Sequence, residues 1–157
     1  MNAPQFLRVY LDVSRRQEET SLVVDNSSKD VCKSAYYWLR PAFHYEWSSG
    51  YDGDYLIGAN NKKGEFIRYR PNLQKGIYQV QLVSPAYQSP EFEGKIKGFY
   101  VRVKSAKGLE KIWIEPDEEI VTVGEFEFGS GKQGYVEIIS EGSRGLIVAD
   151  AVRWKKL

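Results

Sequence analysis

The sequence predicts an all-β fold, arranged as a sandwich or a barrel. Its apolar residues fall in many short runs at regular spacing, separated by clusters of Gly, Pro, Asn, Asp and Ser. No window keeps a helical period for longer than about two turns. The closing run, residues 145–154, is apolar at nearly every position, with Asp150 as the only charge before Arg153 near its end. Such a run predicts a strand that is buried on both faces, at the centre of a sheet.

The composition fits a single domain. At 157 residues the chain is long enough to bury a substantial core. The formal net charge is +1 with acids and bases interspersed, which argues against a basic surface for nucleic acid. No apolar run approaches the roughly 20 residues of a membrane-spanning helix. Cys32 is the only cysteine, so no internal disulfide forms and the redox compartment stays open.

Residues 1–21 are predicted to be a lead-in strand and linker, and residues 22–157 the folded domain. Residues 5–13 have the apolar content of a short strand, and residues 14–21 are charged without an apolar period. The first residues lack the basic start and apolar core of a signal peptide. Either the protein is intracellular, or this chain is a piece of a longer secreted one.

Most later apolar runs predict one strand each. In residues 77–83, strict alternation directs Tyr78, Val80 and Leu82 to the core and the two glutamines outward. In residues 65–70, Phe66 and Tyr69 fall on opposite faces. Strands are expected at residues 22–26, 55–57, 65–70, 77–83, 99–104, 111–114, 120–128, 135–139 and 145–154.

The connections between these strands are predicted from their turn residues. Residues 84–98, which hold two prolines, are expected to be a long loop, and residues 141–145 a turn. Trp113 and Trp154 lie inside regular strands, so both are assigned to the core.

Residues 129–134 match the GxGxxG fingerprint of dinucleotide-binding proteins. That function requires the glycine loop to open a helix, but a short alternating run follows here, so we expect a β-hairpin.

His44 is the only histidine, which makes a multi-histidine metal site impossible and leaves one candidate for a Ser-His-Asp triad. Paired carboxylates for glycoside hydrolysis stay open.

Two acidic positions have both a structural and a ligand-binding interpretation. Asp150, in a buried strand, must be hydrogen-bonded or paired, and we expect an internal contact that fixes loops at the strand's end rather than a ligand contact. Asp52 and Asp54 flank Gly53; we expect a simple turn, with calcium binding as the alternative.

Taken together, the residues resemble the golvesin/xanthan-lyase type of carbohydrate-binding-like domain of bacteria, over residues 22–154. The most specific match is the closing motif Ala-Asp-Ala-Val-Arg at residues 149–153. The other matching pieces, in chain order, are residues 23–26, 47–55, 69–73, 76–80 and 124–128.

The resemblance implies a two-sheet antiparallel β-sandwich, jelly-roll-like and without catalytic machinery. It also implies a polysaccharide-binding accessory module of a larger bacterial enzyme, extracellular or periplasmic, with no cofactor unless calcium binds. The alternative is a structural domain that docks on the catalytic domain of a hydrolase or flavin-dependent oxidoreductase and binds no sugar. An independent enzyme is the third option.

Residues 34–55 are the predicted ligand-binding region because they are unusually rich in aromatic rings. The C–H faces of sugars stack on such rings, and the tips of Tyr and Trp side chains add hydrogen bonds. For each ring, packing in the core between two sheets is the alternative. The candidate ligand-binding residues are Tyr36, Trp38, Arg40, His44, Tyr45, Trp47, Tyr51, Asp52 and Tyr55.

Overall fold

The computed structural model describes residues 21–34, 38, 55–58 and 61–157. Nearly all regular structure in this part of the chain is β-strand, together with two short 3-10 helices, η2 (Pro85–Gln88) and η3 (Pro90–Phe92). The described strands are β1 (Ser21–Asp25), β2 (Val31–Lys33), β3 (Leu56–Gly58), β4 (Phe66–Tyr69), β5 (Gly76–Val83), β6 (Ile96–Ser105), β7 (Gly108–Ile114), β8 (Ile120–Phe128), β9 (Tyr135–Gly145), β10 (Ile147–Ala149) and β11 (Ala151–Lys156).

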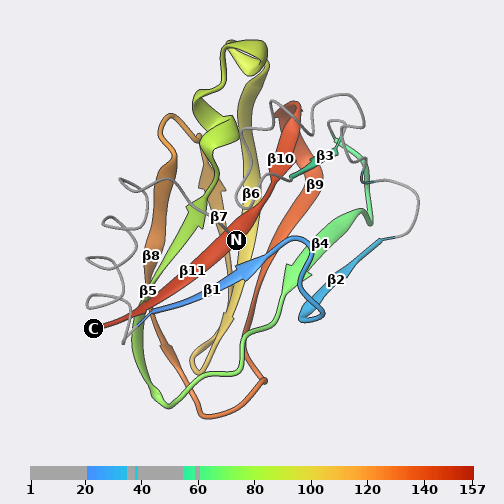
Figure 1. Cartoon of the computed structure of the whole chain (residues 1–157). Coiled ribbons are helices and arrows are strands. Elements are labelled where there is room, and N and C mark those ends of the chain that lie inside the picture. Colours follow the sequence, from blue (N-terminus) through green and yellow to red (C-terminus); the bar gives the residue numbers. More distant parts are fainter. Residues whose placement is uncertain (1–20, 35–37, 39–54, 59–60) are drawn as a thin grey trace, which may run out of the picture.

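These strands form two main antiparallel sheets and one strand pair. One sheet has the order β1-β11-β5-β8, the other β2-β4-β9-β6-β7, and β10 pairs with β3. In Figure 1, β11 lies between β1 and β5. Leaving out β2, successive strands of the two main sheets lie in alternate sheets along the chain, except at the β6–β7 hairpin. This holds for the series β1, β4, β5, β6, β7, β8, β9 and β11. This alternation is the topology of a jelly roll, so the predicted all-β, jelly-roll-like sandwich is confirmed.

The core lies between the two sheets and follows the predicted alternation. Tyr78, Val80 and Leu82 of β5 are buried, each 4% exposed or less. Trp154 of β11 is fully buried, as predicted, and pairs in register with Val80. Tyr69 of β4 faces the same core from the other sheet and is fully buried.

The closing apolar run is not one strand, as predicted, but two. It breaks at Asp150, with β10 before it and β11 after it. The prediction of a central position holds for β11, which pairs with both β1 and β5. At the break, the buried Asp150 carboxylate accepts a hydrogen bond from the Ser84 hydroxyl at 2.6 Å. A side chain held in this way lies at the junction of two strands that pair with different partners.

Two predicted connections are also wrong. Residues 141–145 are not a turn, because β9 continues to Gly145 and pairs there with Ile96 of β6, with irregular register in between. Gly145 has a φ of +73°, and an added Cβ would lie 2.1 Å from the Lys95 carbonyl oxygen. The loop predicted over residues 84–98 is shorter, because η2 and η3 occupy its middle and β6 begins at Ile96. The error at residues 141–145 arises because glycine marks a bulge there rather than a chain reversal.

The glycine-rich residues 129–134 connect β8 to β9 and open no helix, as predicted. The predicted hairpin is wrong, however, because β8 and β9 belong to different sheets. The loop crosses the end of the sandwich, and Gly131 forms a bridge with Leu73.

The boundary predicted between lead-in and domain lies at the edge of the described residues. Ser21 begins β1, and residues 1–20 lie outside the described part, so this division stays a prediction. Within the described residues, no helix is long and apolar enough to cross a membrane.

Candidate functional site

The outer face of the five-stranded sheet, which points away from the other sheet, carries the most chemically distinctive surface among the described residues. Side chains alternate between the two faces of a strand. In β6, Phe99, Val101 and Val103 are fully buried in the core. Tyr100 and Arg102, which lie between them, therefore point to the outer face and are partly exposed.

An aromatic row crosses this outer face from strand to strand. Tyr100 is the register partner of Trp113 on β7 and of Ile139 on β9. Ile139 in turn pairs with Phe66 on β4. The rings of Tyr100 and Trp113 meet edge to face, with centroids 4.9 Å apart and planes at 68°. Such cross-strand aromatic pairs stabilise a sheet and also present ring surface to solvent.

Two glycines lie directly beneath these rings. A Cβ added to Gly98 of β6 would lie 2.2 Å from the Trp113 ring, and one added to Gly142 of β9 would lie 2.9 Å from the Tyr100 ring. Each ring therefore rests against backbone that carries no side chain. Glycine therefore occupies the two positions at which a ring from the neighbouring strand packs directly on the backbone.

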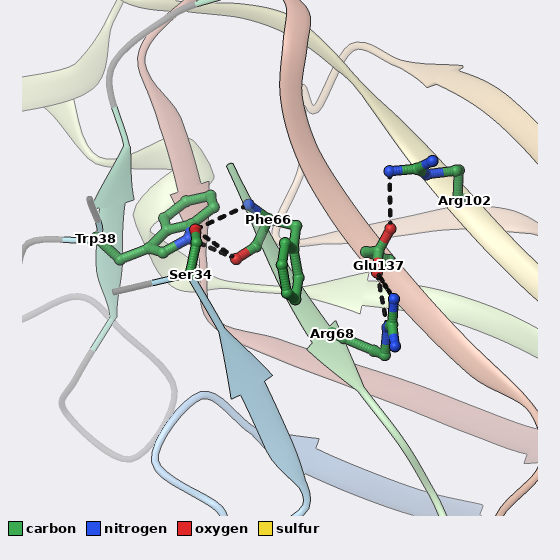
Figure 2. Close-up of polar contacts among 6 residues, drawn as sticks. All are labelled: Ser34, Trp38, Phe66, Arg68, Arg102 and Glu137. Carbon is green, nitrogen blue, oxygen red and sulfur yellow. Dashed lines mark hydrogen bonds and ion pairs between the residues drawn. The ribbon is translucent and has the colours of Figure 1, made fainter. Parts of the chain in front are cut away.

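A charged row runs beside the aromatic row, again in register. The buried Glu137 carboxylate on β9 lies between Arg68 of β4 and Arg102 of β6, at 2.7 Å and 3.0 Å (Figure 2). The Arg68 guanidinium also stacks on the Tyr135 ring, 4.3 Å from its centroid. Lys111 of β7, the register partner of Arg102, places its ammonium 4.3 Å from the centroid of the Tyr100 ring. Aromatic rings and cations are thus interleaved across the face.

A surface hollow of about 620 Å³ opens at one end of the aromatic row. Trp113 and Glu115 both line it, and the Trp113 indole N–H donates to the Glu115 carboxylate at 2.7 Å. This hydrogen bond fixes the orientation of the Trp113 ring, which still lines the hollow on the outer face. The hollow is lined by Lys97, Tyr100, Trp113, Glu115, Gly142 and Arg144.

The arrangement suits a carbohydrate chemically. A sugar ring can stack its C–H face on an aromatic ring, and charged or polar side chains can bind its hydroxyl or carboxylate groups. The two rings, the hollow and the nearby cations supply both kinds of contact within one face.

Of the nine residues predicted to bind ligand, the structure describes two. Trp38 is 6% exposed, and its indole N–H donates to the Phe66 carbonyl oxygen at 2.7 Å, where Ser34 also binds (Figure 2). Tyr55 is 1% exposed, packs edge to face on Phe92 and donates to Glu91 at 2.8 Å. Both rings adopt the packing role given above as the alternative. The other seven candidates, Tyr36, Arg40, His44, Tyr45, Trp47, Tyr51 and Asp52, lie outside the described residues.

Asp150 is held inside the protein, as predicted for a structural carboxylate. Ser84 donates to its side chain at 2.6 Å and Tyr69 to its main-chain carbonyl at 3.0 Å. Tyr87 donates to the neighbouring Val148 carbonyl at 3.1 Å. Burial raises the pKa of both tyrosine hydroxyls above the usual value, and the negative charge of Asp150 raises them further. This buried cluster joins β4, η2 and the β10–β11 junction.

No group of three or more His, Cys, Asp or Glu side chains in the described ranges is placed to hold a metal ion. The predicted calcium position at Asp52 and Asp54 falls outside these ranges, so it stays a prediction.

The assignment of Trp113 to the core is wrong. Its neighbours on β7, Ile112 and Ile114, face the interior, while Trp113 lies on the outer face with Lys111. The alternation of residues 111–114 contains this signal, because a tryptophan that shares a face with a lysine belongs to the solvated side. Tyr100, which alternates with three core residues, carried the same signal.

Comparison with solved structures supports the predicted resemblance at the level of the fold. The chain is similar to a part of a Paenibacillus xanthan lyase, with 24% sequence identity and a TM-score of 0.74, over 90% of this chain and 13% of the lyase chain. It therefore spans about an eighth of that protein. No family model and no curated protein matches the chain.

Two structures of similar size to this chain share the same architecture. One is a family 35 carbohydrate-binding module from Clostridium thermocellum, with 11% identity and a TM-score of 0.56 over 85% of this chain and 98% of the module. The other is the CBM36-1 domain of a multidomain xylanase from the hindgut metagenome of Trinervitermes trinervoides, with 12% identity and a TM-score of 0.54 over 87% and 98%. At these identities the likeness shows a common fold.

Proposed function

We propose that this chain is a non-catalytic accessory module that binds polysaccharide through the outer face of its five-stranded sheet. The observation that carries the proposal is the Tyr100–Trp113 pair, held on glycine backbone at the edge of a surface hollow. Aromatic rings fixed on strands suit sugar stacking, because the protein loses little conformational freedom when the ligand binds.

The fold comparisons support this proposal independently of the site. Two structures whose whole length matches this fold are described as carbohydrate-binding modules or domains of that type. The xanthan lyase contains the fold as a small part of a much longer chain. We therefore place this module in a larger extracellular or periplasmic protein, where it would hold a catalytic domain close to its polysaccharide.

The test is isothermal titration of the protein with a panel of soluble neutral and acidic polysaccharides. We expect saturable binding to at least one of them, with the affinity reduced about tenfold or more in Trp113→Ala, equivalent to about 1.4 kcal/mol. Gly98→Ala should weaken binding in the same direction, because the new Cβ displaces the Trp113 ring without removing it.

The matched control is Ile77→Ala, which truncates an apolar side chain that is 53% exposed on the other sheet. This variant should bind as the wild type does. Unchanged affinity in a folded Trp113→Ala variant would move the site away from this face. Absence of binding to every polysaccharide would overturn the proposal and favour the docking role.

A further inference from the structure

The outer face carries an excess of positive charge, although the whole chain has a net charge of only +1. Two carboxylates, Glu115 and Glu137, lie on the face or at the hollow. The bulge of β9 adds the exposed Glu141 nearby. The cations of the same face and hollow are Arg68, Arg70, Lys97, Arg102, Lys104, Lys111 and Arg144.

These cations differ in how far the protein itself neutralises them. Arg68 and Arg102 share the single carboxylate of Glu137. Lys97 and Arg144, which line the hollow beside Trp113, have no carboxylate within 4 Å among the described residues. Both are exposed side chains, and β6 and β9 bring them together because Arg144 is the register partner of Gly98, the residue after Lys97.

We propose that the ligand is an acidic polysaccharide, with a uronate ring stacked against Trp113 and its carboxylate bound by Lys97 and Arg144. This inference rests on the proposed function, and it adds the substrate class and two binding residues. Arginine and lysine form charge-assisted hydrogen bonds with carboxylates, which are stronger than those between neutral groups. The hollow of about 620 Å³ lies within the range of roughly 300–1,000 Å³ that small-molecule sites occupy.

A saccharide fits this face better than a nucleic acid, the other common polyanion. Nucleic-acid binding depends mainly on many phosphate contacts along a strongly basic surface. Here two of the cations share a buried carboxylate, the Lys111 ammonium lies 4.3 Å from the centroid of the Tyr100 ring, and, of the cations without a carboxylate partner, Lys97 and Arg144 lie at one hollow. That pattern suits a carboxylate at one position rather than a continuous phosphate backbone.

The experiment compares polygalacturonate and alginate with the same polymers after reduction of their carboxyl groups to alcohols. Affinity is measured by isothermal titration at low and moderate NaCl concentration. We expect at least one acidic polymer to bind tenfold or more tightly than its reduced form, and the difference to shrink as salt increases.

The variant Lys97→Gln/Arg144→Gln should lose most of this preference. The matched control Lys75→Gln/Lys155→Gln removes the same charge from two exposed lysines, one just before β5 and one on β11 of the other sheet, and should keep it. Both variants change only exposed side chains, and a circular dichroism spectrum confirms that each is folded.

The outcomes separate the two proposals. Equal affinity for the acidic and reduced forms, or a preference that survives Lys97→Gln/Arg144→Gln, overturns the inference but leaves the proposed function standing. Single-stranded DNA that binds as tightly as the acidic polymers overturns it too, by indicating a general polyanion surface. Absence of binding to any polymer, charged or neutral, overturns both.

Discussion

Replacing Glu137 with glutamine tests whether one buried carboxylate organises the outer face. The Glu137 side chain is 3% exposed and accepts from Arg68 through both Nε and Nη2, each at 2.7 Å. Its other oxygen lies 3.0 Å from Nη2 of Arg102. A glutamine amide has nearly the same shape, but it carries no charge and only one acceptor oxygen. The two guanidinium groups would then lie close together without a counter-charge.

The magnitude follows from the burial of the three groups. Breaking a fully buried ion pair by removing one partner destabilises a protein by about 3–5 kcal/mol. Arg68 and Arg102 are 31% and 39% exposed, so solvent screens part of this loss. We expect Glu137→Gln to lower the free energy of unfolding by about 2 kcal/mol, between the buried and the exposed limits.

Urea unfolding followed by tryptophan fluorescence measures this change. With a slope of about 1–3 kcal/mol per molar urea, the midpoint should fall by about 1 M. The control is Glu110→Gln, an exposed carboxylate on β7 of the same sheet, which should change stability by less than about 0.5 kcal/mol. If the two variants unfold at the same urea concentration, Glu137 does not act as the central counter-ion and this reasoning is refuted.

Three further changes test the interior and the bulge. Burial raises the folded-state pKa of Tyr87 above its unfolded value near 10, so the stability contributed by the protonated Tyr87 hydroxyl is complete below pH 10 and is lost above it. Above pH 10 the free energy of unfolding should therefore fall by up to about 1.4 kcal/mol per pH unit. Urea titrations at pH 8–11 should show a shallower fall in Tyr87→Phe than in the wild type. Ser84→Ala removes the donor 2.6 Å from the Asp150 carboxylate and should lower the unfolding free energy by about 1.5–3 kcal/mol, whereas an unchanged urea midpoint would show that this bond contributes nothing. Gly145→Ala should destabilise by about 3 kcal/mol or more in thermal unfolding, because the methyl group would meet a carbonyl oxygen at 2.1 Å. The control Gly64→Ala has a similar positive φ of +82° but open space around it, so equal losses in the two variants would attribute the effect to φ alone.

The parts of the fold that were predicted correctly are those that alternation determines. The two-residue period of a strand assigns Tyr78, Val80 and Leu82 to one face. In a half-buried strand of eight residues, that face must be the one that packs against the core. Trp154 is likewise correct, because it alternates with Arg153 and Lys155 in β11 and shares a face with the buried Val152. Local pattern was sufficient wherever the strand was regular.

The errors lie where two strands meet or where one strand bends. The sequence does not show that Asp150 separates two strands, since its partner Ser84 is 66 residues away along the chain. Nor does it show that Gly142 and Gly145 lie in a bulge rather than a turn, because both conformations use glycine at positive φ. These features depend on tertiary partners that no local window contains.

The outer face was not predicted as a candidate site, because aromatic density directed attention to residues 34–55 and away from the strands. Ring count measures how much aromatic surface a segment has, whereas binding depends on which rings face solvent. Trp38 and Tyr55 are buried, while Tyr100 and Trp113, in regular strands, line the hollow. Alternation applied to residues 111–114 is the better guide, because it assigns a face to each ring.

A site built on strands has a consequence for how it works. Trp113 is fixed by the Glu115 hydrogen bond, by its edge-to-face contact with Tyr100 and by the Gly98 backbone beneath it. Three constraints on one ring leave it few rotamers to lose, so in the proposed binding the ordering penalty would be small. Glycine at residue 98 therefore matters for the proposed site as well as for the sheet, because a Cβ there would lie 2.2 Å from the Trp113 ring and would displace it.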